Sequence, residues 1–377
     1  MKNKSFFREI KNILIGQDKT PTWMKAIFVL IAIIFSFLLS VLISMIVVKQ
    51  NPIEIIVNYF DGAFKRPYKF FYDAAILLAF GIAIVPCFKM KYWNMGANGQ
   101  FIAGSIIAVL IMNGMENYGK TSTFNNVVVI ILMLIGAVVA STIWTLIPAF
   151  FKARFNTNET LFTLMMNYIA AGLLLYTNTI LSNGNSSTGK INRQSHVGWI
   201  AANDKNMAYL IVVLASLLFA FFIYIFISKT KHGYETIVLG DSYKTAKYAS
   251  MDTKRIISRA TIISGVITGE LAFLVVSVIN RSLSDSFATI SFNAILIAWM
   301  SNFNIVIMIL LSLFLSFTTN GMEYVITLGG LSNNDLVNFI FGLLFFILLF
   351  AEYIIKYRFN KSRLMENYLK KHAKEVI

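Results

Sequence analysis

Charge is scarce in this sequence, and so are the residues on which most enzyme sites depend. Asp, Glu, Lys and Arg make up 14% of its 377 residues, against about a quarter of a typical soluble domain. Cys87 is the only cysteine, which excludes an intrachain disulfide. His196, His232 and His372 lie far apart, and none has the spacing of a metal site. No serine has a nucleophile-elbow context and no pair of acids stands out. We therefore expect no catalytic centre, no metal site and no cofactor.

The sequence is rich in long apolar segments. Hydrophobic residues make up 57% of the chain, and the mean hydropathy is +0.68. No soluble core of this size needs so much apolar surface, so we predict an all-α, polytopic membrane helix bundle. We expect about ten spans, some of them short or broken. The expected spans are Met24–Val48, Tyr72–Phe88, Phe101–Met112, Val127–Phe151, one that begins with Asn158–Ala170, Met207–Ser228, Ile256–Ile279, Phe287–Ser301, Phe303–Thr318 and Asp335–Tyr353.

The basic residues indicate how the chain is oriented. The net charge is +15, which in a soluble protein would suggest nucleic acid as a partner. Here Lys and Arg gather in the two tails and a few loops, so the positive-inside rule predicts cytoplasmic tails and no nucleic acid. We expect a cytoplasmic tail over 1–25, a transmembrane domain over 26–356, and a second cytoplasmic tail over 357–377. The exact span count within 281–335 stays open.

A polar segment, 229–256, lies between two strongly apolar segments on the side that we predict to be cytoplasmic. Ser242 is placed to cap a short helix over Tyr243–Ala249. Three tyrosines, Tyr234, Tyr243 and Tyr248, add apolar area that contact with water alone does not explain. The segment is either a docking surface for another protein or a solvated loop that only links two spans.

A second polar stretch lies where the third span begins. It contains Asn94, Asn98 and Gln100, together with Gly96 and Gly99. Side-chain amides at a span entrance are tolerated only where protein or a water-filled cavity surrounds them. The amides therefore line a substrate path, or the glycines allow neighbouring helices to pack closely there.

The fifth span carries a polar face, because Thr163 and Asn167 share a side of the helix with Thr160. A polar face on a spanning helix indicates a cavity or a neighbouring helix rather than lipid. Thr163 and Asn167 are thus further candidates for the substrate path. The alternative is that Asn167 forms a hydrogen bond across a pair of helices.

The seventh expected span combines small residues with a carboxylate. Gly265 and Gly269 have the spacing that allows close helix packing. Glu270 follows directly, and a carboxylate near mid-span costs about 2.5–3.5 kcal/mol unless it is protonated, paired or hydrated. Glu270 is therefore either a residue of the substrate path or the structural partner of a polar group on another helix.

The stretch Gly114–Thr121 matches the phosphate-loop pattern letter for letter. That mechanism requires a preceding strand and a helix whose N-terminus faces phosphate in the compartment that contains ATP. Here the stretch links two spans on the non-cytoplasmic side. We expect no nucleotide site and no role for Lys120 in transport.

Three further patterns in the sequence are motifs in this order: Asn94, Gly96, Ala97, Gly99 and Gln100; Asn158, Glu159, Thr163, Met165, Asn167, Tyr168, Ile169 and Ala170; and Gly233, Tyr234, Glu235, Gly240, Asp241, Ala246, Tyr248 and Ala249. Together they resemble the motifs of permease subunits of ABC importers for nucleosides and simple sugars, the branched-chain amino acid and ribose type. The resemblance covers roughly Trp93–Arg255 and is weaker over the last third of the chain. Two departures are Asn98, where the family has an acid, and Ser250, where it usually has Gly.

The resemblance implies a function and a set of partners. It implies that the transmembrane domain, 26–356, is a permease domain in the bacterial cell membrane and forms a path for a nucleoside or simple sugar, with ATP hydrolysed on a separate ABC ATPase subunit. A second, homologous permease, an extracellular substrate-binding lipoprotein and the lipid bilayer complete the implied partners. It also implies that the polar segment is the coupling helix that lies in a groove of the ATPase. The residues assigned to coupling in this way are Gly233, Tyr234, Glu235, Gly240, Asp241, Tyr243, Ala246, Tyr248 and Ala249.

An alternative is a secondary transporter that an ion gradient drives and that carries a small polar solute. That class usually has an inverted repeat, broken helices and intramembrane acids that serve coupling. Glu270 is the only such acid well inside a predicted span, and no repeat is convincing. The exact substrate, and whether the permease pairs with itself or with a paralogue, are left open.

Overall fold

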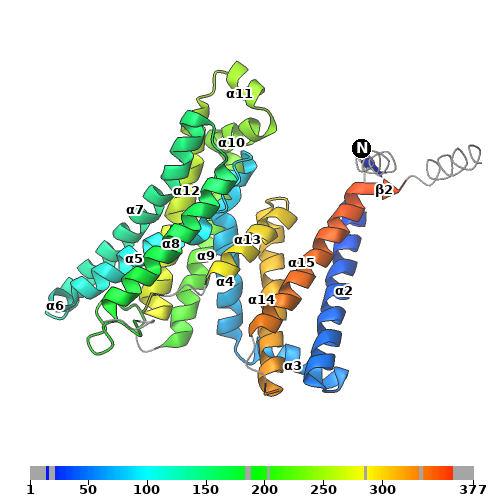
Figure 1. Cartoon of the computed structure of the whole chain (residues 1–377), viewed down its shortest axis with the longest axis horizontal. Coiled ribbons are helices and arrows are strands. Elements are labelled where there is room, and N and C mark those ends of the chain that lie inside the picture. Colours follow the sequence, from blue (N-terminus) through cyan, green and yellow to red (C-terminus); the bar gives the residue numbers. More distant parts are fainter. Residues whose placement is uncertain are drawn as a thin grey trace, which may run out of the picture. The chain divides into compact units, whose positions relative to one another are not determined.

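The computed structural model describes residues 14–16, 22–182, 188–201, 204–283, 287–330 and 334–359. Helices dominate this part of the chain (Figure 1), which confirms the predicted all-α class. A short antiparallel pair of strands is the exception, in which β1 (Leu14–Gly16) pairs with β2 (Tyr357–Phe359). The chain divides into two compact units: one combines the chain up to Gly62 with the chain from Thr318 onward, and the other is Ala63–Phe317.

The helices account for a membrane protein of many spans. Seven described helices are long and apolar enough to cross a membrane, or eight if the pair Ile33–Val48 and Pro52–Phe64, bent by 110°, forms one span. Two shorter apolar helices, Ala288–Met300 and Val337–Ile347, add to these. The helices are α2 (Thr22–Val48), α3 (Pro52–Phe64), α4 (Pro67–Lys89), α5 (Ala97–Gly114), α6 (Glu116–Gly119), α7 (Thr123–Phe155), α8 (Glu159–Leu181), α9 (Lys205–Lys229), α10 (Lys231–Asp241), α11 (Tyr243–Tyr248), α12 (Thr253–Leu274), the π-helix η1 (Val275–Asn280), α13 (Ala288–Met300), α14 (Ile305–Leu328) and α15 (Asn334–Lys356).

Two prolines lie inside a helix or at its start. Pro86 lies inside α4, which continues to Lys89 although a proline in a helix interior removes a hydrogen bond. Neighbouring helices bury almost all of α4 and so support its backbone there. Pro52 begins α3, where a proline costs no helical hydrogen bond.

The predicted break after the eighth expected span is present. Helix α13 ends at Met300 and α14 begins at Ile305. Asn302 and Phe303, between them, both have positive φ angles, 49° and 61°, a conformation that ends a helix. The eighth and ninth expected spans are therefore separate helices, although α14 continues well beyond the predicted end at Thr318.

The larger unit, Ala63–Phe317, is built around α4 and α12. Helix α12 packs mainly on α7, and two glycines permit that contact. A Cβ on Gly265 would lie 2.6 Å from the Cα atom of Thr142, and one on Gly269 would lie 2.6 Å from the Cα atom of Val138. Helices α5, α4 and α9 also contact α12. Both glycines thus lie where two backbones come too close for any larger residue.

The smaller unit has a core of its own, centred on Tyr59 of α3. The Tyr59 ring is fully buried and stands edge-on to Phe37 of α2. Its hydroxyl lies 3.2 Å from the Ser44 hydroxyl and 3.3 Å from that of Ser40. A buried tyrosine hydroxyl in an apolar core needs such partners, so these contacts fix α3 against α2.

Candidate functional site

The polar segment after α9 folds into two short helices, α10 and α11. The Ser242 side chain accepts a hydrogen bond from the Thr245 amide at 3.2 Å, so the expected capped helix is present as α11. Sequence reasoning missed α10, because Gly233 and Gly240 favoured a loop. Thr230 caps α10 and Asp252 caps α12, so α10, α11 and α12 each begin with a side-chain cap.

Three tyrosines project from this pair of helices. The exposed fractions are 63% for Tyr234, 61% for Tyr243 and 90% for Tyr248. Lys244 and Lys247 are exposed on α11, the helix that also carries Tyr243 and Tyr248. Figure 1 shows α11 at one end of the larger unit and α6 at the other. This segment, 230–252, combines apolar area with positive charge and leaves both open to a partner. We call it the coupling segment.

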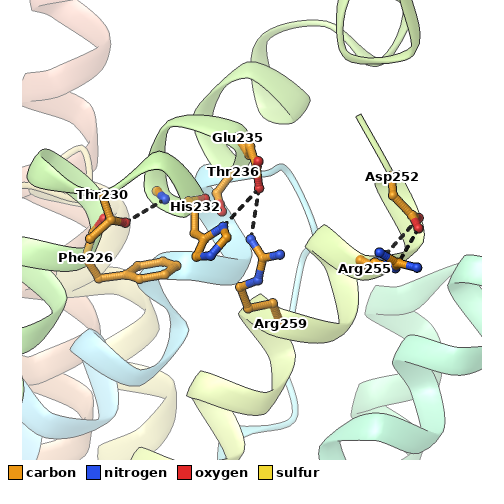
Figure 2. A network of polar contacts seen from close by, with 9 residues as sticks. Phe226, Thr230, His232, Glu235, Thr236, Asp252, Arg255 and Arg259 are labelled. Carbon is orange, nitrogen blue, oxygen red and sulfur yellow. Dashed lines mark hydrogen bonds and ion pairs between the residues drawn. The ribbon is translucent and has the colours of Figure 1, made fainter. Parts of the chain in front are cut away.

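Helix α10 is joined to its neighbours by polar contacts (Figure 2). The Thr230 hydroxyl accepts from the Gly233 amide at 3.0 Å and donates to the Phe226 carbonyl at 2.6 Å. Arg259 of α12 donates to the Glu235 carboxylate at 2.9 Å. This guanidinium holds the pKa of Glu235 below its usual value. The bend between α9 and α10, and the approach of α10 to α12, are therefore both fixed by side chains.

The polar entrance of α5 is buried among three helices. Asn94 donates to the Ser264 hydroxyl of α12 at 3.2 Å and accepts from the Gln100 side chain at 3.1 Å. The side-chain oxygen of Gln100, Oε1, accepts in turn from the hydroxyl groups of Ser264 and Thr268, each at 3.3 Å. Both Asn94 and Gln100 are almost completely excluded from solvent. Their side chains thus form hydrogen bonds to protein and do not face an open cavity.

Helix α8 contributes the second half of this network. Asn167 accepts from the Gly99 amide at 2.8 Å and donates to the Met95 carbonyl at 2.9 Å. Thr163 accepts from the Met95 amide at 3.1 Å. The first amides of any helix lack partners within that helix, and α5 has no side-chain cap of its own. Asn167 of α8 supplies the partner for one of these amides, that of Gly99, and the structure thereby shows the hydrogen bond across a helix pair that was the alternative for Asn167.

The glycines of this entrance allow that arrangement. A Cβ on Gly99 would lie 2.8 Å from the Asn167 side-chain oxygen, and one on Gly96 would lie 3.2 Å from the Thr163 Cβ atom. Five residues, Asn94, Gln100, Thr163, Asn167 and Ser264, together with these glycines, form what we call the capping network. Four of the six residues that we predicted to line the substrate path belong to it.

The two other path candidates lie apart from these four. Asn98 is buried on α5. Glu270 is half-buried on α12, and no described residue forms a hydrogen bond or ion pair with its side chain. Both alternatives for Glu270 stay predictions. Among the described residues, no group of three His, Cys, Asp or Glu side chains could hold a metal ion.

Tyr168 of α8 matches the second motif, but it was not among the residues that we predicted to line the substrate path. Its side chain is 81% exposed, near the middle of a helix that runs from Glu159 to Leu181. Gly172 has no atom within 4 Å of an added Cβ, and Tyr176 is 67% exposed. These three residues follow one another at intervals of four along one face of the helix, a spacing that the sequence alone displays.

The stretch that matches the phosphate-loop pattern lacks the required context. Gly114 ends α5, and the four residues of α6 follow, so a helix precedes the match where a strand is needed. Lys120 forms an ion pair with Glu116 at 2.8 Å. The match is therefore a coincidence of letters at the opposite end of the unit from the coupling segment.

Comparison with known proteins assigns the chain to a family. Residues 68–349 match the family described as the branched-chain amino acid transport system permease component. The chain belongs to this permease family. The matched residues include the capping network, Tyr168 and the coupling segment, so the family is the one that the three sequence motifs indicated, and that prediction is confirmed.

Individual relatives in this permease family are more distant. The chain is 28% identical to the guanosine ABC transporter permease protein NupP of Bacillus subtilis (strain 168), over 50% of this chain and 53% of the relative. It is 24% identical to the nucleoside ABC transporter permease protein NupB of Lactococcus lactis subsp. cremoris (strain MG1363), over 65% and 69%. It is 23% identical to the glucose ABC transporter permease protein TsgB13 of Haloferax volcanii, over 47% and 48%. The match thus spans about half the length of NupP, and no solved structure matches.

Proposed function

We propose that this permease-family chain is the membrane subunit of an ABC importer and carries a nucleoside or a simple sugar. The observation that carries the proposal is the coupling segment, whose three tyrosines are exposed although they lie in a folded, capped structure. Exposed aromatic area beside positive charge is typical of a surface that another protein covers. In this family member, the partner that fits is an ABC ATPase subunit.

The remaining partners follow from the same proposal. A second, homologous permease completes the path, and an extracellular substrate-binding lipoprotein delivers the substrate. The coupling segment and both termini then lie in the cytoplasm, as the distribution of Lys and Arg predicts. The chain itself catalyses no reaction, and ATP is hydrolysed on the partner.

We place the substrate path along the outward face of α8. The Tyr168 hydroxyl lies near mid-helix and has no hydrogen-bond partner among the described residues. At that depth, lipid offers no partner for a hydroxyl group, so protein or water must face it. The capping network lies behind α8 and holds it against α5. Thr163 and Asn167 then position the path-lining helix, and Tyr168 contacts what passes.

The substrate class is inferred from the relatives and from the ring of Tyr168. NupP is named for guanosine, NupB for nucleosides and TsgB13 for glucose. A tyrosine ring offers a flat apolar face with a hydroxyl at its edge, and it can stack on a nucleobase or on a sugar ring. A nucleoside combines both groups and is therefore the first substrate to test.

A secondary transporter is not favoured. Its coupling ion would need intramembrane acids arranged as a binding site. Glu270 lies on α12 without a charged partner among the described residues, and the described part of the chain holds no acidic cluster that could bind a metal ion.

Reconstitution tests the proposal. The chain is placed in liposomes either alone or with the candidate ATPase, permease and lipoprotein subunits, and uptake of labelled guanosine, uridine and glucose is measured. We expect no uptake by the chain alone and ATP-dependent uptake by the complex. Uptake by the chain alone, driven by an ion gradient, would instead establish the secondary transporter.

A further inference from the structure

Helix α10 touches the ends of three membrane-spanning helices, and its first contact is with α9. A Cβ on Gly233 would overlap the Phe226 carbonyl and lie 2.7 Å from the Cα atom of Ile227. The Thr230 hydroxyl bonds to both sides of the same bend, at Phe226 and at Gly233. The start of α10 is therefore held against the last turns of α9 with no space for relative movement.

The second contact is with the end of α4. A Cβ on Gly240 would overlap the Lys89 carbonyl and lie 3.0 Å from the Cα atom of Met90. The chain continues from Met90 through a short turn to Asn94, a member of the capping network. The far end of α10 thus presses on the segment that leads into the polar entrance of α5.

The third contact, with α12, is an ion pair. Glu235 accepts from Arg259 at 2.9 Å, and the two side chains are only 16% and 33% exposed. Figure 2 shows the Glu235 carboxylate between His232 of its own helix and Arg259. Because the two residues belong to different helices, this pair links elements that chain connectivity leaves free to separate. A partly shielded pair of this kind is stronger than a fully exposed one.

We propose that α10 is a rigid crossbar that carries a displacement of α11 into α9, α4 and α12 together. The Glu235–Arg259 pair is its connection to α12. Glu235 and Arg259 are positioning residues: they touch neither ATP nor substrate and transmit movement between the surface that binds the ATPase and the spans. The inference rests on the proposed function, because it assigns a mechanical role to contacts beside the proposed docking surface.

A purely structural role for the pair makes a different prediction. If Glu235 and Arg259 only stabilise the fold, a variant lowers the amount and the melting temperature of the complex, and the surviving molecules transport normally. If they connect the crossbar to α12, the variant complex assembles and hydrolyses ATP, but hydrolysis no longer drives uptake. The ratio of substrate molecules transported to ATP hydrolysed separates these two roles.

The variants are Arg259→Ala, Arg259→Glu, Glu235→Arg and the charge exchange that combines the last two. Arg255→Ala is the matched control, since Arg255 pairs with Asp252 within α12 and the two side chains are 82% and 51% exposed. Each variant is purified in the reconstituted complex. Retention of the ATPase, the ATPase rate and guanosine uptake are measured on the same liposomes.

We expect Arg259→Ala and Arg259→Glu to retain the ATPase subunit but to lower the uptake per ATP about tenfold. The charge exchange should recover most of that loss, and Arg255→Ala should leave the ratio unchanged. An unchanged ratio in both Arg259 variants, or a fall in ATPase retention that accounts for all of the lost uptake, would overturn the crossbar. Failure of the wild-type chain to retain any ATPase would instead refute the proposed function.

Discussion

The capping network and the coupling segment are both polar regions in a mostly apolar chain, yet their side chains end in different surroundings. In the capping network, Asn94 and Asn167 are buried and hydrogen-bonded to protein. In the coupling segment, Tyr234, Tyr243 and Tyr248 are more than half exposed. For both regions the sequence left a functional and a structural interpretation open, and of the two only the second has exposed side chains that another molecule could contact.

The difference shows how a polar residue in a membrane protein can be interpreted. An amide inside a span is costly unless it is paired, and here pairing is achieved by completing the hydrogen bonds at the start of α5. A tyrosine that remains exposed on a folded helix does not complete hydrogen bonds inside the protein in this way. A polar side chain whose hydrogen bonds are completed within the protein therefore indicates a structural role. An aromatic side chain that stays exposed on a folded helix indicates a binding partner.

Replacing Asn167 by Ala tests the architectural half of this comparison. The change leaves the buried Gly99 amide and the partly buried Met95 carbonyl without their partner. Each unsatisfied group costs about 1–3 kcal/mol, so we expect a loss of about 2–6 kcal/mol in the free energy of unfolding. Thermal unfolding of the purified chain in detergent measures it.

Asn206→Ala provides the control, because Asn206 is an exposed residue at the start of α9. We expect a change within about 0.5 kcal/mol for that variant. If Asn167→Ala were as stable as Asn206→Ala and lost only transport, the capping network would be part of the substrate path after all.

Replacing Tyr234 and Tyr248 together by Ala tests the other half. Large aromatic anchors contribute about 2 kcal/mol each to an interface, so we expect ATPase retention to fall at least about tenfold while membrane insertion is unchanged. Co-purification with the tagged ATPase measures this. Tyr118→Ala, at an exposed site on α6, should retain the ATPase fully, and equal retention by all three proteins would remove the docking role.

Tyr168 shares one property with each region, since it is exposed like the tyrosines of the coupling segment but lies within a span like the capping network. We expect Tyr168→Ala to raise the KM for guanosine uptake about tenfold, the loss of one stacking contact. Tyr168→Phe, which keeps the ring, should lose less. Leu173→Ala, on another side of α8, is the control, and a Tyr168→Ala transporter with unchanged KM would place the path elsewhere.

The Glu235–Arg259 pair predicts a small dependence of stability on pH. The pKa of Glu235 is lowered by Arg259, so the folded state binds this proton less readily than the unfolded state, where the pKa is about 4.3. The stabilisation is complete above that value and is lost as the pH falls through the folded pKa. Comparing melting temperatures, we expect Glu235→Gln to lie below wild type at neutral pH and the difference to shrink below about pH 4. A difference that grows on acidification would contradict this assignment.

The smallest effect is expected at Lys120. Its ion pair with Glu116 is solvent-exposed, and such pairs contribute about 0–1 kcal/mol. We expect Lys120→Ala to leave guanosine uptake and stability unchanged. Binding of a fluorescent ATP analogue to the wild-type chain that disappears in Lys120→Ala would restore the phosphate-loop interpretation.

Local signals in the sequence were sufficient for much of the fold. Ser242 predicted the start of α11, because helix capping depends only on a residue and its near neighbours in the sequence. The break near Asn302 was predicted from the apolar pattern, which divides there into Phe287–Ser301 and Phe303–Thr318. Helix α10 was missed because Gly233 and Gly240 look like helix breakers, whereas the structure uses them to bring α10 close to α9 and α4.

The surroundings of the polar residues depend on contacts between distant parts of the chain. Asn94 and Ser264 are 170 residues apart, and Asn167 lies 68 residues from Gly99. No local pattern predicts such pairs, so the same amides could equally face a cavity or a helix. The exposure of Tyr168 was missed for the same reason, although its spacing to Gly172 and Tyr176 was visible.

Labelling at position 244 tests most directly whether the coupling segment meets a cytoplasmic partner. Lys244 is exposed on α11, and the native Cys87 is buried, so a cysteine introduced by Lys244→Cys provides the accessible thiol. With a membrane-impermeant maleimide, we expect no labelling in intact cells, labelling in inverted vesicles, and protection when the ATPase subunit is bound. Labelling in intact cells would show that the segment faces the exterior, where no ATPase could bind it.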